Sequence, residues 1–115
     1  MALQKSYDHE SGINLPNAYH KVSNVSYDNA DSGLINFSVS IYADSSARLN
    51  GNPSVTRFSY GSNTITGNVD SSSFEQYFSI SAMDATNANI VKNVYEYMKT
   101  QSDINGVDYT DSTDV

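Results

Sequence analysis

The stretch that decides the fold is residues 34–43, which read Leu-Ile-Asn-Phe-Ser-Val-Ser-Ile-Tyr-Ala. Apolar side chains occupy every second position, at Ile35, Phe37, Val39, Ile41 and Ala43. Successive side chains of a β-strand point to opposite faces, so this pattern predicts a strand with one packed face and one wetter face. A helix would scatter the same residues around its circumference.

Weaker alternation on both sides of this stretch predicts further strands. They cover residues 1–7, 17–27, 55–60 and 74–82, with a short hairpin arm at 65–69. In the 17–27 strand, period two puts Tyr19, Val25 and Tyr27 on one face. The other face then carries Ala18, His20 and Val22. Polar clusters rich in Asp, Asn, Ser and Gly separate the predicted strands, as expected for turns.

One segment has helical periodicity. Within residues 86–100, a single apolar stripe is formed by Ile90, Val91, Val94, Tyr95 and Met98. Strands followed by one helix favour an α+β fold, with an antiparallel β-meander or sandwich-like sheet and one C-terminal amphipathic helix. We expect residues 1–101 to form a single domain. Residues 102–115 are polar and acidic, and we expect a tail that is flexible or ordered only by a partner.

Composition excludes several classes of function. Acidic residues outnumber basic ones by 13 to 6, giving a net charge of −7, which argues against a nucleic-acid partner. No apolar run approaches the roughly 20 residues that a membrane span needs. The absence of cysteine removes disulfides, thiolate metal sites and cysteine nucleophiles. Ser, Thr and Asn supply 39 of the 115 residues, while nine Tyr argue against disorder.

No motif indicates catalysis, a cofactor or a metal. His9 and His20 are the two histidines, and neither has a second ligand at metal-binding spacing. No Gly-x-Ser-x-Gly nucleophile turn is present. The last 13 residues carry Asp103, Asp108, Asp111 and Asp114, but their order is not that of a calcium-binding loop. We therefore predict a protein that is not an enzyme and acts on no small-molecule substrate.

Tyrosine is the side chain in this sequence best suited to contact a partner, because it combines a large apolar ring with a polar hydroxyl. The candidate interface residues are Tyr19, Tyr42, Tyr60, Tyr77, Tyr95 and Tyr97. Such side chains serve most often in cross-strand pairing, nearly as often in contact with another protein, and more rarely in stacking on sugar rings, and their spacing does not separate the three. Among them Tyr97 falls off the apolar stripe of the helix, so we expect it to be an exposed contact.

Short motifs along the chain resemble those of small virion proteins of tailed bacteriophages. Ala18-Tyr19-His20-Lys21-Val22 is similar to a strand that follows a short N-terminal strand in that group. The resemblance resumes in residues 41–48. It returns in Tyr95-Glu96-Tyr97-Met98-Lys99-Thr100, which is similar to the end of the helix in that group, before the acidic tail. It spans nearly the whole chain.

The resemblance implies a non-enzymatic structural subunit of the virion, made in the cytoplasm of the host bacterium. Its expected place is the tail, at the baseplate, the fibre attachment or the tail tip. The expected partners are other virion proteins and further copies of the chain. Three alternatives stay open: a decoration or cement protein of the head, a carbohydrate-binding module that uses the tyrosines, and a hydrolase.

Overall fold

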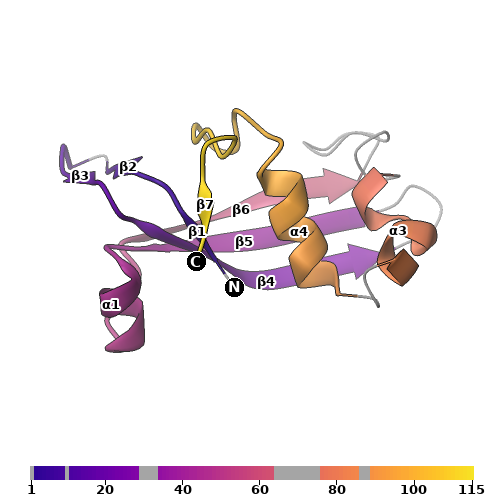
Figure 1. The fold of residues 1–115 in the computed structure, drawn as a ribbon, viewed down its shortest axis with the longest axis horizontal. Helices are drawn as coiled ribbons and strands as arrows, with labels where there is room; N and C mark the ends of the chain where they lie inside the picture. The colour runs from indigo at the N-terminus through magenta and orange to yellow at the C-terminus, as the bar shows by residue number, and fades with distance from the viewer. Residues whose placement is uncertain (1, 10, 29–33, 64–75, 86–88) are drawn as a thin grey trace.

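The computed structural model describes residues 2–9, 11–28, 34–63, 76–85 and 89–115 (Figure 1). At its centre lies a five-stranded antiparallel sheet in the order β6-β5-β4-β1-β7. The strands are β1 (Leu3–Gln4), β4 (Tyr19–Asp28), β5 (Leu34–Tyr42), β6 (Thr56–Asn63) and β7 (Thr113–Asp114). A second small sheet pairs β2 (Tyr7–Asp8) with β3 (Asn14–Leu15). The predicted α+β class with an antiparallel sheet is confirmed.

Strand β5 is central, and its strict alternation is confirmed. Ile35, Phe37, Val39 and Ile41 are buried on one face, and Ser38 and Ser40 alternate with them on the other face, where they too are buried, at 7% and 5% exposure. Strand β4 pairs along one side of β5, and β6 along the other. The periodicity of residues 34–43 therefore identifies the strand around which the sheet is built.

Strand β4 corrects one prediction about faces. Its register with β5 shifts between Val22 and Asn24, which inserts one extra residue as a β-bulge. Beyond the bulge, Val25 and Tyr27 point to the same face as Val22, toward the core. Tyr19, before the bulge, points to the opposite face. A single inserted residue reverses the inside and outside positions of everything that follows it.

The C-terminal helix predicted in residues 86–100 is confirmed as α4 (Ile90–Met98). The Asn89 side chain caps it by accepting a hydrogen bond from the Lys92 amide. A short helix, α1 (Ser45–Leu49), lies where the sequence predicts a loop, and Asp44 caps it in the same way. A further helix is α3 (Ile80–Ala85).

The predicted strand at residues 74–82 is wrong. Residues 76–78 are helical and α3 begins at Ile80, while residues 74 and 75 and the predicted arm at 65–69 lie outside the described residues. Phe78 is fully buried, and its carbonyl accepts a hydrogen bond from the Tyr27 hydroxyl. Residues four apart share a face in both periodicities, so Phe78 and Ala82 fit a helix as well as a strand.

The core lies between the sheet and the helices α3 and α4, which cover one sheet face (Figure 1). Residues 102–115 belong to this structure and do not stand apart from it as a tail. Ile104 and Tyr109 are fully buried in the core, with Val107 beside them, and β7 pairs with β1. The expected tail differs from the structure because a few apolar residues, widely spaced in an acidic segment, suffice to anchor it.

Candidate interaction surfaces

Two of the candidate tyrosines lie on the sheet face opposite the helices. Tyr19 and Tyr42 are cross-strand partners, with ring centroids 6.2 Å apart in an edge-to-face arrangement. Both side chains are half-buried. The Arg48 guanidinium carbon stands 5.6 Å from the Tyr42 ring centroid, a cation–π contact. This pair is therefore available to a partner at one end of the face.

Two other candidates face the core. The Tyr60 ring packs 5.7 Å from the Phe37 ring, and the Tyr77 ring lies 5.9 Å from that of Tyr97. Tyr60 and Tyr77 keep partial exposure at the rim of the core cluster. Their main role in the structure is aromatic packing.

The remaining two candidates are buried, so the prediction of an exposed contact at Tyr97 is wrong. Tyr95 and Tyr97 are each 1% exposed. Tyr97 packs against Phe37 on the sheet and against Tyr77 and Phe78 on the neighbouring helical segment. Because α4 is covered from more than one side, its buried face is wider than the apolar stripe alone indicates.

The sheet face opposite α4 carries cross-strand rows of polar side chains, and we call it the open face. One row runs from Lys21 on β4 through Ser40 on β5 to Arg57 on β6. The next row along the strands is Asn24–Ser38–Ser59. The row after it pairs Ser26 with Asn36 and ends at Gly61, which has no side chain. In the part of the chain that the structure describes, α3 and α4 lie on the other face (Figure 1).

Small side chains leave a shallow groove along the open face. It has a volume of about 260 Å³ and is lined by Asn24, Ser26, Asn36, Phe37, Ser38 and Ser59. The Ser38 and Ser59 hydroxyls lie 3.0 Å apart, and the Ser40 hydroxyl donates to that of Ser23 at 3.1 Å. The groove therefore presents hydroxyl and amide groups in fixed positions.

The outer edge of β6 and the edge of β4 beyond β1 differ in how their backbone groups are paired. No described strand pairs with the outer side of β6, which runs for eight residues. On β4, β1 pairs only with Tyr19 and His20. Just beyond, the Val22 amide donates to the Tyr95 hydroxyl at 2.8 Å. A side chain from α4 thus takes the place of a neighbouring strand, and the bulge further discourages strand addition there.

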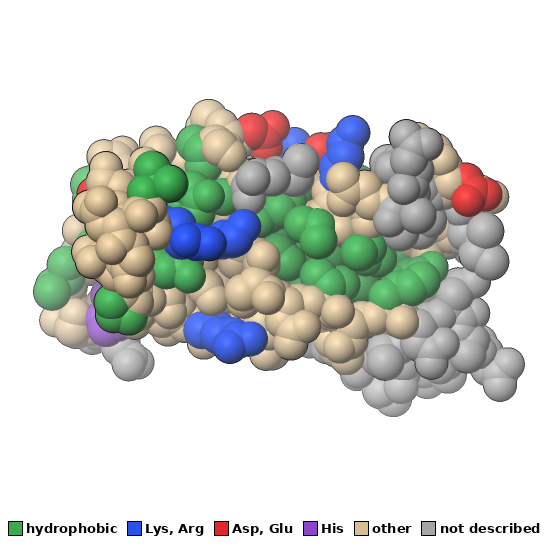
Figure 2. All heavy atoms as spheres, turned by 90° about the horizontal axis from the view of Figure 1, so that it is seen from below, with side chains coloured by type: hydrophobic (Ala, Val, Ile, Leu, Met, Phe, Trp, Pro, Cys, Tyr) green, Lys and Arg blue, Asp and Glu red, His purple; other side chains and the backbone are tan. Residues whose placement is uncertain are grey.

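Figure 2 looks toward the β4 side of the molecule and shows hydrophobic side chains gathered in a band, with polar side chains below it. Val25 and Tyr27 on β4 and Ile90 on α4 are partly exposed members of the core cluster. Val91 on α4 is 38% exposed. The seam between the sheet and the helix is therefore incompletely covered by the described residues.

A buried histidine holds the C-terminal segment on the sheet. His20 is 0% exposed, and its Nδ1 lies 2.8 Å from the Tyr109 hydroxyl. Its Nε2 lies 2.9 Å from the Lys5 carbonyl. A carbonyl can only accept, so Nε2 carries the proton and the Tyr109 hydroxyl donates to Nδ1. His20 is therefore neutral and satisfied on both ring nitrogens.

Burial changes the pKa values of this pair. It lowers the pKa of His20 from 6.5 to about 4, against a smaller opposing effect of the hydrogen bond to Lys5. The positive charge of Lys5 lowers the pKa of His20 further. Burial also raises the pKa of the Tyr109 hydroxyl. Both groups are thus held in their neutral forms at neutral pH.

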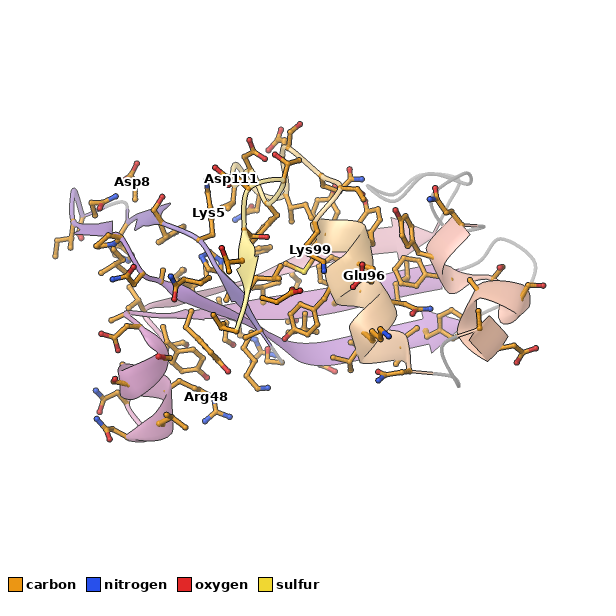
Figure 3. All side chains as sticks on the ribbon, in the orientation of Figure 1. Lys5, Asp8, Arg48, Glu96, Lys99 and Asp111 are labelled. Carbon is orange, nitrogen blue, oxygen red and sulfur yellow. The ribbon has the colours of Figure 1, made fainter. Side chains whose placement is uncertain are left out.

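Ion pairs fasten the same segment from outside. The Lys5 Nζ lies 2.6 Å from an Asp111 carboxylate oxygen, and the Lys99 Nζ lies 3.3 Å from one of Asp114 (Figure 3). Lys99 also pairs with Glu96, one turn earlier on α4. Hydrogen bonds to Glu96 and Asp114 raise the pKa of Lys99.

Asp8 and Asp108 take part in no ion pair of the described residues. Asp8 and Asp108 line a hollow of about 370 Å³ between residues 5–8 and 105–108, which we call the acidic hollow. The Thr110 hydroxyl and amide both donate to Asp108, and these hydrogen bonds lower the pKa of its carboxyl. The charge of nearby Lys5 also contributes to lowering the pKa of Asp108. Asp108 is therefore a fixed negative charge at the surface.

Sequence reasoning missed the residues that organise these surfaces. The hydrogen bond between His20 and Tyr109 joins residues 89 positions apart in the chain, and no local sequence pattern predicts it. The row of Lys21 and Arg57 depends on the registers of three strands. A usable signal existed for Lys21, because it shares its predicted face with Tyr19 in the short stretch before the bulge.

Comparison with protein-family models, with curated proteins and with solved structures finds no match for this chain. Within the described residues, no group of three or more His, Cys, Asp or Glu side chains could hold a metal ion. No described helix has the length and hydropathy needed to cross a membrane.

Proposed function

We propose that this chain is a non-enzymatic structural subunit of a tailed-phage virion, located in the tail. In this proposal it acts by associating with further copies of itself and by docking to neighbouring virion proteins. Position in the tail means the baseplate, the fibre attachment or the tail tip. The head, where the chain would serve as a decoration or cement protein, is the alternative location.

The observation that carries the proposal is the open face together with the outer side of β6. The described helices all pack against the core face or flank the end of the sheet, so a polar face of three strands lacks a layer within the described chain. Exposed sheet edges promote pairing with other chains, and subunits of assemblies use such surfaces for symmetric contacts. The half-buried Tyr19 and Tyr42 add the aromatic area typical of interfaces.

The sequence motifs provide the second line of support. The segment that resembles the phage group, Ala18 to Val22, supplies Tyr19 and Lys21 of the open face and His20 beneath it. The segment 41–48 supplies Tyr42 and Arg48. Two of the three motifs that carry the resemblance therefore contribute residues to this surface or beside it, whereas the third, residues 95–100, lies in and just after α4.

The test is localisation in the particle together with mass in solution. Mass spectrometry of purified particles should find the chain, and electron cryo-microscopy should assign density of this fold to the tail. Density on the head would replace the tail location with the alternative. A chain that is absent from purified particles and is monomeric in solution would contradict the proposal altogether.

The groove on the open face favours carbohydrate binding as a second candidate function. Sugar recognition combines hydroxyl and amide hydrogen bonds with stacking on aromatic rings; the groove supplies the hydroxyl and amide groups, and the Tyr19–Tyr42 pair lies further along the same face. A glycan array with the wild-type chain and with Asn36→Ala tests it. Binding that Asn36→Ala abolishes would support this function, whereas no binding to any glycan would exclude it.

A further inference from the structure

Positive charge gathers on the open face of an otherwise acidic chain. Lys21 and Arg57 flank Ser40 in one cross-strand row, and we call these two residues the basic row. Neighbouring strands lie about 4.8 Å apart, so the two backbones are about 10 Å apart on the same face. Arg48 adds a third cation at the adjacent tyrosine pair. Half of the six basic residues of the chain thus lie on or beside this face.

The basic row has no partner within the described chain. All three ion pairs of the described residues involve Lys5 or Lys99, on the other side of the molecule. Arg57 is exposed and Lys21 is partly exposed. A neighbouring molecule could therefore reach both charges without displacing an existing contact.

The same chain carries the complementary surface. Residues 100–115 contain four Asp and no Lys or Arg. Asp111 pairs with Lys5, and Asp114 pairs with Lys99. Asp8 and Asp108 line the acidic hollow and form no ion pair themselves; the one cation that also lines it, Lys5, is already paired with Asp111. The hollow, about 370 Å³, is large enough to admit the end of a long side chain.

The two surfaces cannot meet within one molecule. The C-terminal segment packs among core residues on the α4 side of the sheet, whereas the basic row points away from that side. Figure 3 shows Asp8, Lys5 and Asp111 along one long side of the molecule and Arg48 on the other. Any contact between basic row and acidic hollow must therefore join two copies.

We propose that the basic row of one copy docks at the acidic hollow of a second copy, in a head-to-tail contact. Different patches meet in such a contact, so repetition builds a ring or a filament and not a closed two-fold dimer. Exposed charge pairs contribute little energy each, and their main effects are orientation and association rate. The Ser and Asn rows and the tyrosine pair supply hydrogen bonds and buried area around them. This inference rests on the proposed self-association and names its surfaces.

The test is sedimentation velocity of the full chain at low and high salt with charge-reversal variants. We expect the wild-type chain to associate at low salt and to dissociate as salt screens the contact. Lys21→Glu with Arg57→Glu should weaken association at least about tenfold, because like charges then face each other. Lys92→Glu is the matched control: it lies on the exposed side of α4 and should associate as the wild type does.

A mixing experiment tests the pairing itself. Asp8→Lys with Asp108→Lys should also be monomeric alone, with thermal unfolding that shows the fold is kept. Mixed one to one with Lys21→Glu/Arg57→Glu, it should form a complex, because the two reversed surfaces match. If both variants are monomeric and the mixture stays monomeric, this pairing is overturned.

The outcomes separate this inference from the proposed function. Oligomers that are unaffected by Lys21→Glu/Arg57→Glu would overturn the head-to-tail contact and leave self-association standing. A wild-type chain that is monomeric at every salt concentration would contradict both. A monomeric chain that binds alginate, a linear acidic polysaccharide, through Arg57 would assign the basic row to a glycan and overturn the inference.

Discussion

His20 is the residue whose chemistry has the clearest consequence for stability. It lies fully buried between the Tyr109 hydroxyl and the Lys5 carbonyl, and both contacts suit the neutral imidazole. Protonation would place a positive charge in a buried site, which is the main reason for the low pKa of His20, and would require the Tyr109 hydroxyl to turn and accept. The N-terminal strand, β4 and the C-terminal segment meet at this ring, so its protonation loosens all three.

We therefore expect stability to fall on acidification. The pKa of His20 is about 4 in the folded chain against 6.5 in the unfolded chain, so the unfolded chain takes up the proton first. This contribution is complete above pH 6.5 and is lost as the pH falls to about 4. At about 1.4 kcal/mol for each pH unit, the two pKa values correspond to about 3 kcal/mol.

Urea unfolding between pH 7.5 and pH 4 measures this effect. His20→Gln should remove most of the dependence between pH 6.5 and pH 4, whereas His9→Gln, in a surface turn with Ser11, should keep it. An identical pH dependence in wild type and His20→Gln would show that other groups are responsible.

Tyr97 is a core residue, and its replacement should show this. Tyr97→Ala leaves a cavity among Phe37, Tyr77 and Phe78, so we expect a loss of about 3–5 kcal/mol in unfolding free energy, similar to that of Phe37→Ala. Tyr42→Ala, on the open face, should cost much less. Denaturant unfolding of the three variants decides; a loss below 1 kcal/mol at Tyr97 would contradict its assignment to the core.

At the scale of elements, α4 finishes the sheet on the side where β1 stops. The Tyr95 hydroxyl accepts the Val22 amide proton at 2.8 Å in a buried position. Tyr95→Phe removes this acceptor and leaves a buried donor unpaired, which costs about 1–3 kcal/mol.

Hydrogen exchange at the Val22 amide is the direct readout of this capping. We expect the amide to be protected in the wild-type chain and to exchange faster in Tyr95→Phe. Tyr42→Phe, at a half-buried tyrosine of the open face, serves as the matched control and should leave the rate unchanged. Equal protection in Tyr95→Phe and the wild type would mean that this bond does not close the edge.

The C-terminal segment is an element of the fold, so its removal should be severe. Ending the chain after Gln101 removes Ile104, Val107 and Tyr109 from the core. Burying an apolar side chain contributes about 1.5–3 kcal/mol, so the three together approach the whole stability of a small domain. We expect the truncated chain to lose its near-ultraviolet circular dichroism.

A full-length chain with Asp103→Asn and Asp108→Asn controls for charge and should remain folded. A truncated chain with wild-type spectra and unfolding would contradict this account and restore residues 1–101 as a complete domain.

The elements predicted correctly are those with long, regular patterns. Five apolar positions at period two identify β5, and the stripe from Ile90 to Met98 identifies α4. Residues 76–82 are too short a run for the period to separate strand from helix; the structure makes 76–78 helical and joins them to β4 by the hydrogen bond from the Tyr27 hydroxyl to the Phe78 carbonyl.

The candidate site was less predictable, because it depends on contacts distant in sequence. The bulge after Val22 reverses the faces of Val25 and Tyr27, and nothing in the local sequence marks it. Tyr97 is buried by a helical segment that the pattern does not predict. The partnership of Tyr109 with His20 likewise exists only once the chain is folded.

At the scale of the whole molecule, the described structure is asymmetric in both layering and charge. Helices α3 and α4 and the acidic C-terminal segment lie on one side of the sheet, and polar rows with Lys21 and Arg57 lie on the other. Within the described residues, no helix layer covers the sheet face of Lys21 and Arg57, and in the proposed assembly that face is the one left to neighbours. The low apolar content, 38%, fits a subunit that shares part of its buried surface with other copies.

The central claim is that this chain associates with itself, and its mass in solution tests the claim most directly. Sedimentation velocity of the full chain over a wide range of concentration, at low salt, gives that mass. The account predicts species that grow with concentration beyond the 12.6 kDa monomer. A single 12.6 kDa species at every concentration would contradict it.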